Sequence, residues 1–193
     1  MVGYRAPSFS VTGRSMWALD VLIEEGYTYD TSIFPIRHDR YGIPDAPRHP
    51  YWIAHSAAGN HQLEQGAAAE DHRSEQGFSP ARHGSILEIP GSTIRLFGAN
   101  LPVAGGGYFR LLPYWWTRFG IRRVNGTEGK PAVFYIHPWE VDPGQPRLQG
   151  SRLSRFRHYR NLAKTESRLR RLLADFTFGP LAEAVRATIP KAA

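Results

Sequence analysis

His137 is one of the few residues in this sequence whose position points to chemistry. It follows the apolar run at 131–136 and precedes Pro138, Trp139 and Glu140. The end of a buried strand is where α/β barrels carry catalytic groups, and a histidine there could act as a general acid near neutral pH. Glu140 could bind substrate or orient the ring. A core histidine bonded to a backbone carbonyl is the alternative, and position alone supports the two equally.

Arg5 and Asp30 are two further candidates. The proline of the Arg5-Ala6-Pro7 segment restricts its backbone, which would hold the arginine at a fixed angle. An arginine in a cleft can orient a carboxylate through a bidentate pair. From these residues alone, however, a surface arginine and a turn aspartate are the favoured interpretations.

Alternating strands and helices must position these side chains. Strands are expected where apolar runs end in turn residues, at 31–34, 86–89, 93–97 and 131–136. A turn at 91–92 would join the second and third of them. Helical spacing predicts a helix at 17–23 that ends at Gly26, and another at 109–124 that is interrupted at Pro113. This alternation indicates an α/β arrangement.

Length and composition are those of a globular protein with one main core. The chain has 193 residues, of which 41% are hydrophobic and 21% charged. The absence of cysteine excludes disulfides, thiolate metal sites and a cysteine nucleophile. No apolar run is long enough for a membrane span, so none is expected, and no signal peptide is visible.

Residues 55–84 are polar and hold almost no large apolar side chains, so a mobile surface insertion is expected there. Its four histidines do not follow a metal-ligand spacing, which favours a plain loop over a zinc tract.

Basic residues are concentrated at 147–171. This segment contains nine arginines and lysines and one acidic residue, Glu166, so its net charge is +8. Such a segment could hold a nucleic acid, an anionic glycan or a membrane surface. Leucine and aromatic positions recur there at helical spacing, so the solvated face of one basic helix is the favoured interpretation. No nucleic-acid motif accompanies it, and no nucleic-acid partner is expected.

Several motifs together resemble the NodB-homology polysaccharide deacetylases. Gly3-Tyr4-Arg5-Ala6-Pro7 resembles the third motif of that family, 26–32 the region of the fourth, and Phe134-Tyr135-Ile136-His137-Pro138 the fifth. The stretches 41–47, 105–110 and 137–140 are similar to the subgroup found with exopolysaccharide clusters and the exosortase (PEP-CTERM) system. The resemblance covers nearly the whole chain apart from 55–84.

The resemblance implies the C-terminal part of a distorted (β/α) barrel at 1–145, followed by a basic helical extension at 146–193. It implies de-N-acetylation of an amino-sugar polysaccharide, a hydrolysis of a non-peptide C–N bond. Arg5 would orient the catalytic base aspartate, and His137 would protonate the leaving amine. The substrate-binding residues would be Tyr4, Asp30, Trp139 and Glu140.

Two motifs of that family do not occur in this sequence: the Thr-Phe-Asp-Asp run with the base, and the His-x-x-x-His pair of metal ligands. We therefore expect an inactive C-terminal part of an enzyme. Its divalent metal, usually zinc, would be held by ligands outside this chain, in the missing N-terminal part of the barrel. The compartment stays open between bacterial cytoplasm and periplasm.

Two alternatives remain. One is a non-catalytic carbohydrate-binding remnant with a platform of Trp115, Trp116, Trp139 and nearby tyrosines. The other is a basic module that binds an anionic polymer through 147–171.

Overall fold

A computed structural model describes residues 2–56, 84–103 and 105–183. They form a mixed α/β structure with two small sheets, as expected from the alternation of elements. Two compact units are present. Among the described residues, the first holds those up to Gly91, Arg95–Asn100 and Leu181–Glu183, and the second holds those of Ser92–Ile94 and Leu101–Pro180. Within the described residues no helix is both long and apolar enough to cross a membrane.

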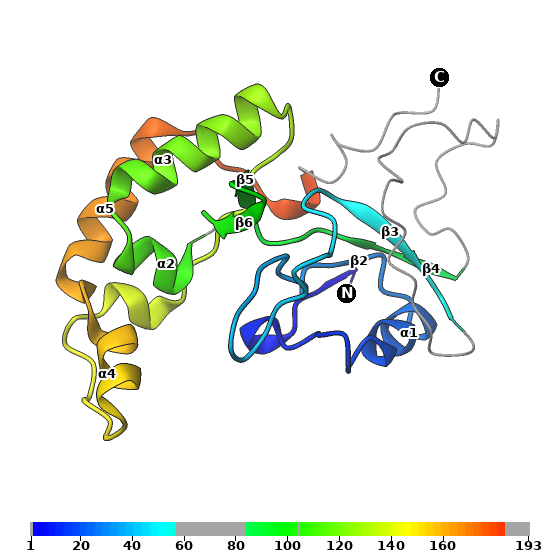
Figure 1. Ribbon diagram of the computed structural model, residues 1–193, viewed down its shortest axis with the longest axis horizontal. Coiled ribbons are helices and arrows are strands. Elements are labelled where there is room, and N and C mark those ends of the chain that lie inside the picture. Colours follow the sequence, from blue (N-terminus) through cyan, green and yellow to red (C-terminus); the bar gives the residue numbers. More distant parts are fainter. Residues whose placement is uncertain (1, 57–83, 104, 184–193) are drawn as a thin grey trace. The chain divides into compact units, whose positions relative to one another are not determined.

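A four-stranded sheet organises the first unit (Figure 1). Its strands are β1 (Gly3–Tyr4), β2 (Tyr29–Asp30), β4 (Ser85–Glu88) and β3 (Tyr51–Ala54), in that spatial order. β1, β2 and β4 run parallel, and β3 is antiparallel to β4. A short 3-10 helix, η1 (Pro7–Phe9), follows β1.

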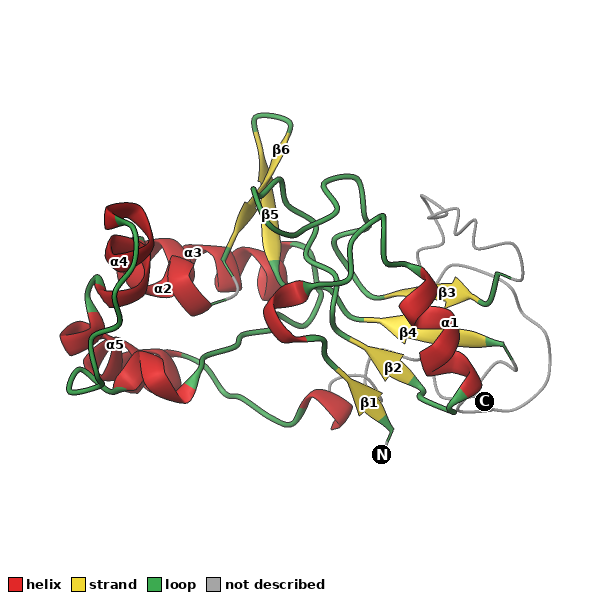
Figure 2. Cartoon of the chain, turned by 90° about the horizontal axis from the view of Figure 1, so that it is seen from below, coloured by secondary structure: helices red, strands yellow, loops and turns green. Residues whose placement is uncertain are grey.

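Helix α1 (Trp17–Glu24) connects β1 to β2 and lies over the sheet (Figure 2). The helix at 17–23 is therefore confirmed. It buries Leu19 and Leu22 in a core that also contains Ile33 and Ile86. Gly26 follows its end with φ +79°, a conformation that glycine adopts at little cost.

Helices dominate the second unit: α2 (Gly106–Leu111), α3 (Tyr114–Arg122), α4 (Arg152–Tyr159) and α5 (Leu162–Asp175). A π-helical turn, η2 (Arg123–Thr127), extends α3, and a 3-10 helix, η3 (Pro138–Val141), follows His137. The predicted interruption at Pro113 is confirmed. Phe109, Ile121 and Leu172 form the apolar centre of this unit.

The strand expected at 31–34 is wrong, since β2 ends at Asp30. Two backbone N–H groups of this segment donate to side-chain carboxyl groups instead of to a neighbouring strand. The Asp30 carboxylate accepts from the backbone N–H of Ser32 (3.1 Å), and the Glu88 carboxyl accepts from that of Ile33 (3.0 Å). Residues 31–34 are buried but irregular.

The strand expected at 131–136 is reduced to one parallel bridge between Tyr135 and Gly105. Two of its backbone donors again bind side chains: Asn125 accepts from the N–H of Ala132, and Ser92 accepts from that of Val133. An extended segment that lacks a neighbouring strand cannot form a ladder.

The turn expected at 91–92 does not join two paired strands. β5 (Thr93–Leu96) pairs instead with β6 (Ala99–Pro102), through a turn in which Phe97 and Gly98 have positive φ.

The single basic helix is divided into α4 and α5 by Asn161, whose φ is +60°. The expected insertion at 55–84 lies almost wholly outside the described residues. The expected domain boundary at 145 stays a prediction, because compact units of one structure are not sequence domains.

Candidate functional site

The predicted site residues fall into one group in each unit. Tyr4, Arg5 and Asp30 belong to the first unit, and His137, Trp139 and Glu140 to the second. Each group contains buried charge.

In the first unit a single register row crosses the sheet. It consists of Tyr4 on β1, Asp30 on β2, Glu88 on β4 and Tyr51 on β3. Directly paired residues on neighbouring strands point to the same face, so two carboxyl groups and two phenols line up. Asp30 and Glu88 have no exposed surface, whereas Tyr4 is 37% exposed.

The Asp30 side chain forms hydrogen bonds with the residues that directly follow it. Its carboxylate accepts from the N–H (3.1 Å) and the hydroxyl (2.6 Å) of Ser32, whose oxygen in turn accepts from the N–H of Ala6. Asp30 is therefore buried and internally engaged. This arrangement favours a positioning role over the direct sugar contact inferred from the sequence.

Glu88 is buried beside Asp30. One oxygen accepts from Ile33 N–H, and the other meets no donor among the described residues. Burial, reinforced by the charge of Asp30 and a hydrogen bond to it, raises the pKa of Glu88 well above its usual range. A proton on Glu88 lets it donate to Asp30. Burial, with the negative charge of Asp30, likewise raises the pKa of Tyr51.

Arg5 binds the loop that follows β2. Its Nε donates to the carbonyl oxygen of Thr31 (3.1 Å), and Nη2 donates to the Thr31 hydroxyl (2.7 Å). The guanidinium carbon lies 5.1 Å from the centre of the Phe9 ring. Pro7 begins η1 directly after this segment, which keeps the chain from continuing as a strand.

In the second unit Arg110 and Glu140 form a buried ion pair. Arg110 Nε lies 2.7 Å from Glu140 Oε1, and the two side chains are 3% and 1% exposed. The other carboxylate oxygen accepts from His137 N–H (2.9 Å) and lies 3.1 Å from His137 Nδ1. The histidine side chain is 49% exposed. Both oxygens of Glu140 are thus used inside the protein, which favours orientation of His137 over substrate contact.

Arg110 also caps the C-terminal end of α4. Its Nη1 donates to the carbonyl oxygens of Arg157, His158 and Arg160, at 3.0, 2.8 and 3.2 Å. These carbonyls have no partner within the helix, so a cation there satisfies them. The same side chain therefore links α2, η3 and α4.

Trp139 contacts two histidine rings. It stacks on His158 (4.1 Å between centres, 13° between planes) and less closely on His137 (5.7 Å, 28°). Burial and the charge of Arg110 lower the pKa of His158. His158 Nε2 lies 3.0 Å from Gln145 Oε1. The guanidinium carbon of Arg110 also lies 4.9 Å from the centre of the Trp139 ring. Side chains of this chain therefore already contact much of the indole, and the half-exposed ring of His137 lies at its edge.

Sequence reasoning missed Arg110, Glu88, Tyr51 and His158. Glu88 carried a signal, because it is a charged residue within the apolar run at 86–89. The others carried none beyond the 105–110 stretch that contains Arg110.

The remaining sequence candidates lie on helices. Trp115 and Trp116 meet edge to face on α3, and Trp115 is 63% exposed. Several side chains of the basic segment contact neighbours: Arg147 and Arg160 lie over aromatic rings, and Arg168 donates to three carbonyl oxygens at the end of α2. These contacts accord with a largely structural face.

The described residues contain no group of three or more histidine, aspartate or glutamate side chains that could hold a metal ion. They do not fit the zinc site that the resemblance implies for the complete enzyme.

A family model described as "Domain of unknown function (DUF3473)" matches residues 61–186. The chain belongs to the DUF3473 family. This domain is known in polysaccharide deacetylase-like proteins. No curated protein and no solved structure matches the chain.

Proposed function

We propose that this DUF3473 chain is part of a metal-dependent polysaccharide N-deacetylase of the NodB type, in the exosortase-associated subgroup. The occurrence of the domain in deacetylase-like proteins and the order of the motifs support this proposal. The parallel strands β1, β2 and β4, with α1 between the first two, are compatible with part of a (β/α) barrel.

The observation that carries the proposal is the orientation of His137. Glu140 faces Nδ1, which leaves Nε2 of a half-exposed ring as the nitrogen that can meet a substrate. In amide hydrolysis, water adds to the carbonyl carbon, the C–N bond breaks, and the leaving nitrogen takes a proton. Because Nδ1 donates to Glu140, Nε2 holds a proton only in the imidazolium form of His137. That form would supply the proton to the leaving nitrogen, with the sugar beside the partly exposed Trp139.

The base and the metal ligands would come from a polypeptide that carries the two absent motifs. This chain alone would then release no acetate. A bound divalent metal would polarise the amide carbonyl in the complete enzyme.

The test uses the protein from its source, captured with an antibody to this chain. We expect acetate release from N-acetylglucosamine oligosaccharides that stops with a chelator and returns with zinc. His137→Asn, introduced into the source gene, should lower the rate by about 10² or more, the range of a lost general acid. Arg152→Gln, a change on the exposed face of α4, is the control. Full activity of the His137 variant would contradict the assigned role.

A non-catalytic carbohydrate-binding role is the second candidate, favoured by the exposure of Trp115 and by the stacked rings of Trp139 and His158. Glycan binding that needs no metal, together with no acetate release from the captured protein, would support it.

A further inference from the structure

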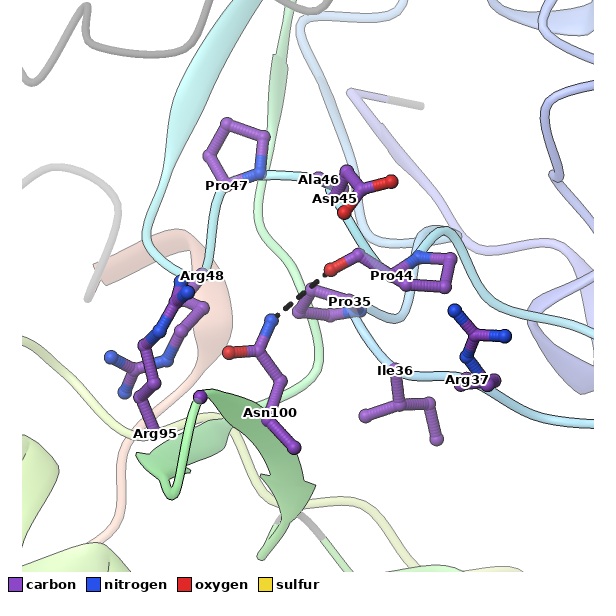
Figure 3. Close-up of a pocket in the computed structure, with 12 residues that line it drawn as sticks. Pro35, Ile36, Arg37, Pro44, Asp45, Ala46, Pro47, Arg48, Arg95 and Asn100 are labelled. Atoms are coloured by element: carbon purple, nitrogen blue, oxygen red, sulfur yellow. Dashed lines mark hydrogen bonds between the residues drawn. The ribbon is translucent and has the colours of Figure 1, made fainter.

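A polar pocket lies in the first unit, and none of the residues of the register row lines it. Its volume is about 510 Å³, within the usual range for small-ligand sites. The loops at 35–37 and 44–48 form one wall, and residues of the β5–β6 hairpin form the other (Figure 3).

Positive charge dominates the pocket lining. Arg37, Arg48 and Arg95 contribute three positive charges against the single negative charge of Asp45, a balance of +2. Figure 3 shows Arg48 and Arg95 on one side of Asn100 and Arg37 on the other. Guanidinium groups that border one cavity favour an anion, and their planar donors match a carboxylate.

Asn100 adds a neutral polar group between the arginines. Its Nδ2 donates to the carbonyl oxygen of Pro44 at 3.3 Å, which orients the amide. Its Oδ1 is buried and accepts no hydrogen bond from the described residues. A buried acceptor without a donor is costly, and a rotation of this side chain toward the cavity would let a ligand hydroxyl supply the donor.

The rest of the lining is apolar and rigid. Pro35, Pro44 and Pro47 present ring surfaces to the cavity. Because a proline ring restricts φ, these loops lose less backbone freedom when a ligand binds. The lining thus combines cationic donors, a hydroxyl acceptor and flat apolar surface.

We propose that this pocket binds an acidic sugar residue, with its carboxylate on the arginines and a hydroxyl at Asn100. The inference rests on the proposed function and narrows its substrate class to an anionic polysaccharide. Such a polymer would contain uronic acid or a similar carboxylate sugar besides the N-acetylated sugar.

The test compares two oligosaccharides that share N-acetylglucosamine. A hyaluronan tetrasaccharide carries glucuronate carboxylates, and chitotetraose carries none. We measure binding to the full chain by calorimetry at low salt and expect the hyaluronan tetrasaccharide to bind about tenfold more tightly. The difference should shrink as salt is raised, because exposed charges are screened.

The double variant Arg37→Gln/Arg95→Gln removes two exposed charges of the pocket. We expect it to weaken hyaluronan binding about tenfold, which corresponds to the loss of two modest ion pairs. Binding of chitotetraose should stay unchanged. Arg14→Gln, also exposed and in the same unit, is the matched control and should change neither. Thermal melting of each variant verifies folding.

Equal affinity for the two oligosaccharides would overturn the pocket assignment and leave the deacetylase proposal standing. Inorganic phosphate that displaces hyaluronan more strongly than free glucuronate does would also overturn it, since the pocket would then be a phosphate site. A third outcome is that the chain prefers the charged oligosaccharide while the protein captured from its source releases no acetate. That result would support the pocket assignment and refute the proposed deacetylase activity.

Discussion

Arg110 and Glu140 lie thirty residues apart in the chain, and their side chains meet at 2.7 Å with almost no exposed surface. This contact fixes η3 and therefore His137, because the second oxygen of Glu140 holds the histidine backbone and ring. A buried ion pair contributes little net stability compared with an apolar pair, but loss of one partner leaves an uncompensated charge.

Arg110→Gln should therefore lower the free energy of unfolding by about 3–5 kcal/mol. The change also removes the donor to three carbonyl oxygens at the end of α4. Urea denaturation measures the effect. The matched control is Arg170→Gln, which breaks an exposed pair with Glu166 on α5 and should cost less than about 1 kcal/mol. Equal losses in the two variants would show that the Arg110–Glu140 pair does not stabilise the fold.

The two histidines around Trp139 should have opposite neutral tautomers. A carboxylate paired with a guanidinium accepts hydrogen bonds, so His137 donates from Nδ1 to Glu140. Gln145 already donates from Nε2 to the carbonyl oxygens of Trp139 and Asp142, so its Oε1 accepts from His158 Nε2.

Two-bond ¹⁵N–¹H NMR spectra at pH 8 distinguish the tautomers. Glu140→Gln should shift His137 away from the Nδ1–H form and leave His158 unchanged, which a general loss of structure would not do. The same tautomer for both rings in the unaltered protein would refute the network.

The sequence predicts an element correctly where nearby residues alone determine its bounds. Apolar periodicity and Gly26 define α1, and Pro113 separates α2 from α3 because it lacks an N–H and disfavours a helical residue before it. The strand predicted at 131–136 does not form a ladder, and two of its backbone donors bind the side chains of Asn125 and Ser92 instead. Sequence periodicity does not reveal such side-chain acceptors.

The same limit applies to the candidate site. His137, Glu140 and Trp139 are adjacent in the sequence, so they could be grouped by inspection. Arg110 enters only through tertiary packing. Its donation to carbonyl oxygens at the end of α4, together with the left-handed Asn161, divides the helix that the sequence predicts as one.

Gly105 and Gly107 in the glycine run should respond oppositely to alanine. At Gly105, φ is +110° and a Cβ would overlap the carbonyl oxygen of Tyr135. Gly105→Ala should therefore destabilise the fold by about 2 kcal/mol or more and disturb the segment that leads to His137. At Gly107 the nearest atom is a terminal nitrogen of Arg110 at 3.8 Å. Since Gly107 lies in α2, Gly107→Ala should be neutral or stabilising by up to about 1 kcal/mol.

Thermal denaturation of the two variants measures the difference in stability. Similar destabilisation by both would contradict the close approach of Gly105 to Tyr135.

Glu88 should make the protein less stable as the pH rises. Burial, with Asp30 beside it, raises its folded pKa well above the unfolded value of about 4.5, so the folded state binds the extra proton. The contribution is fully present below that value and is lost as pH increases toward the folded pKa. Glu88→Gln is the informative change, because the amide keeps an acceptor for Ile33 N–H and a donor toward Asp30 without a titrating proton.

We expect Glu88→Gln to equal or exceed the stability of the unaltered protein at pH 8 and to flatten the decline between pH 5 and 8. Urea denaturation at several pH values measures both. Glu25→Gln, a change at an exposed residue directly after α1, is the control for a carboxyl group on the surface. If Glu88→Gln were strongly destabilising at pH 8 while the slope persisted, Glu88 would be ionised in the fold, and its second oxygen would need a cationic partner that the described residues do not provide.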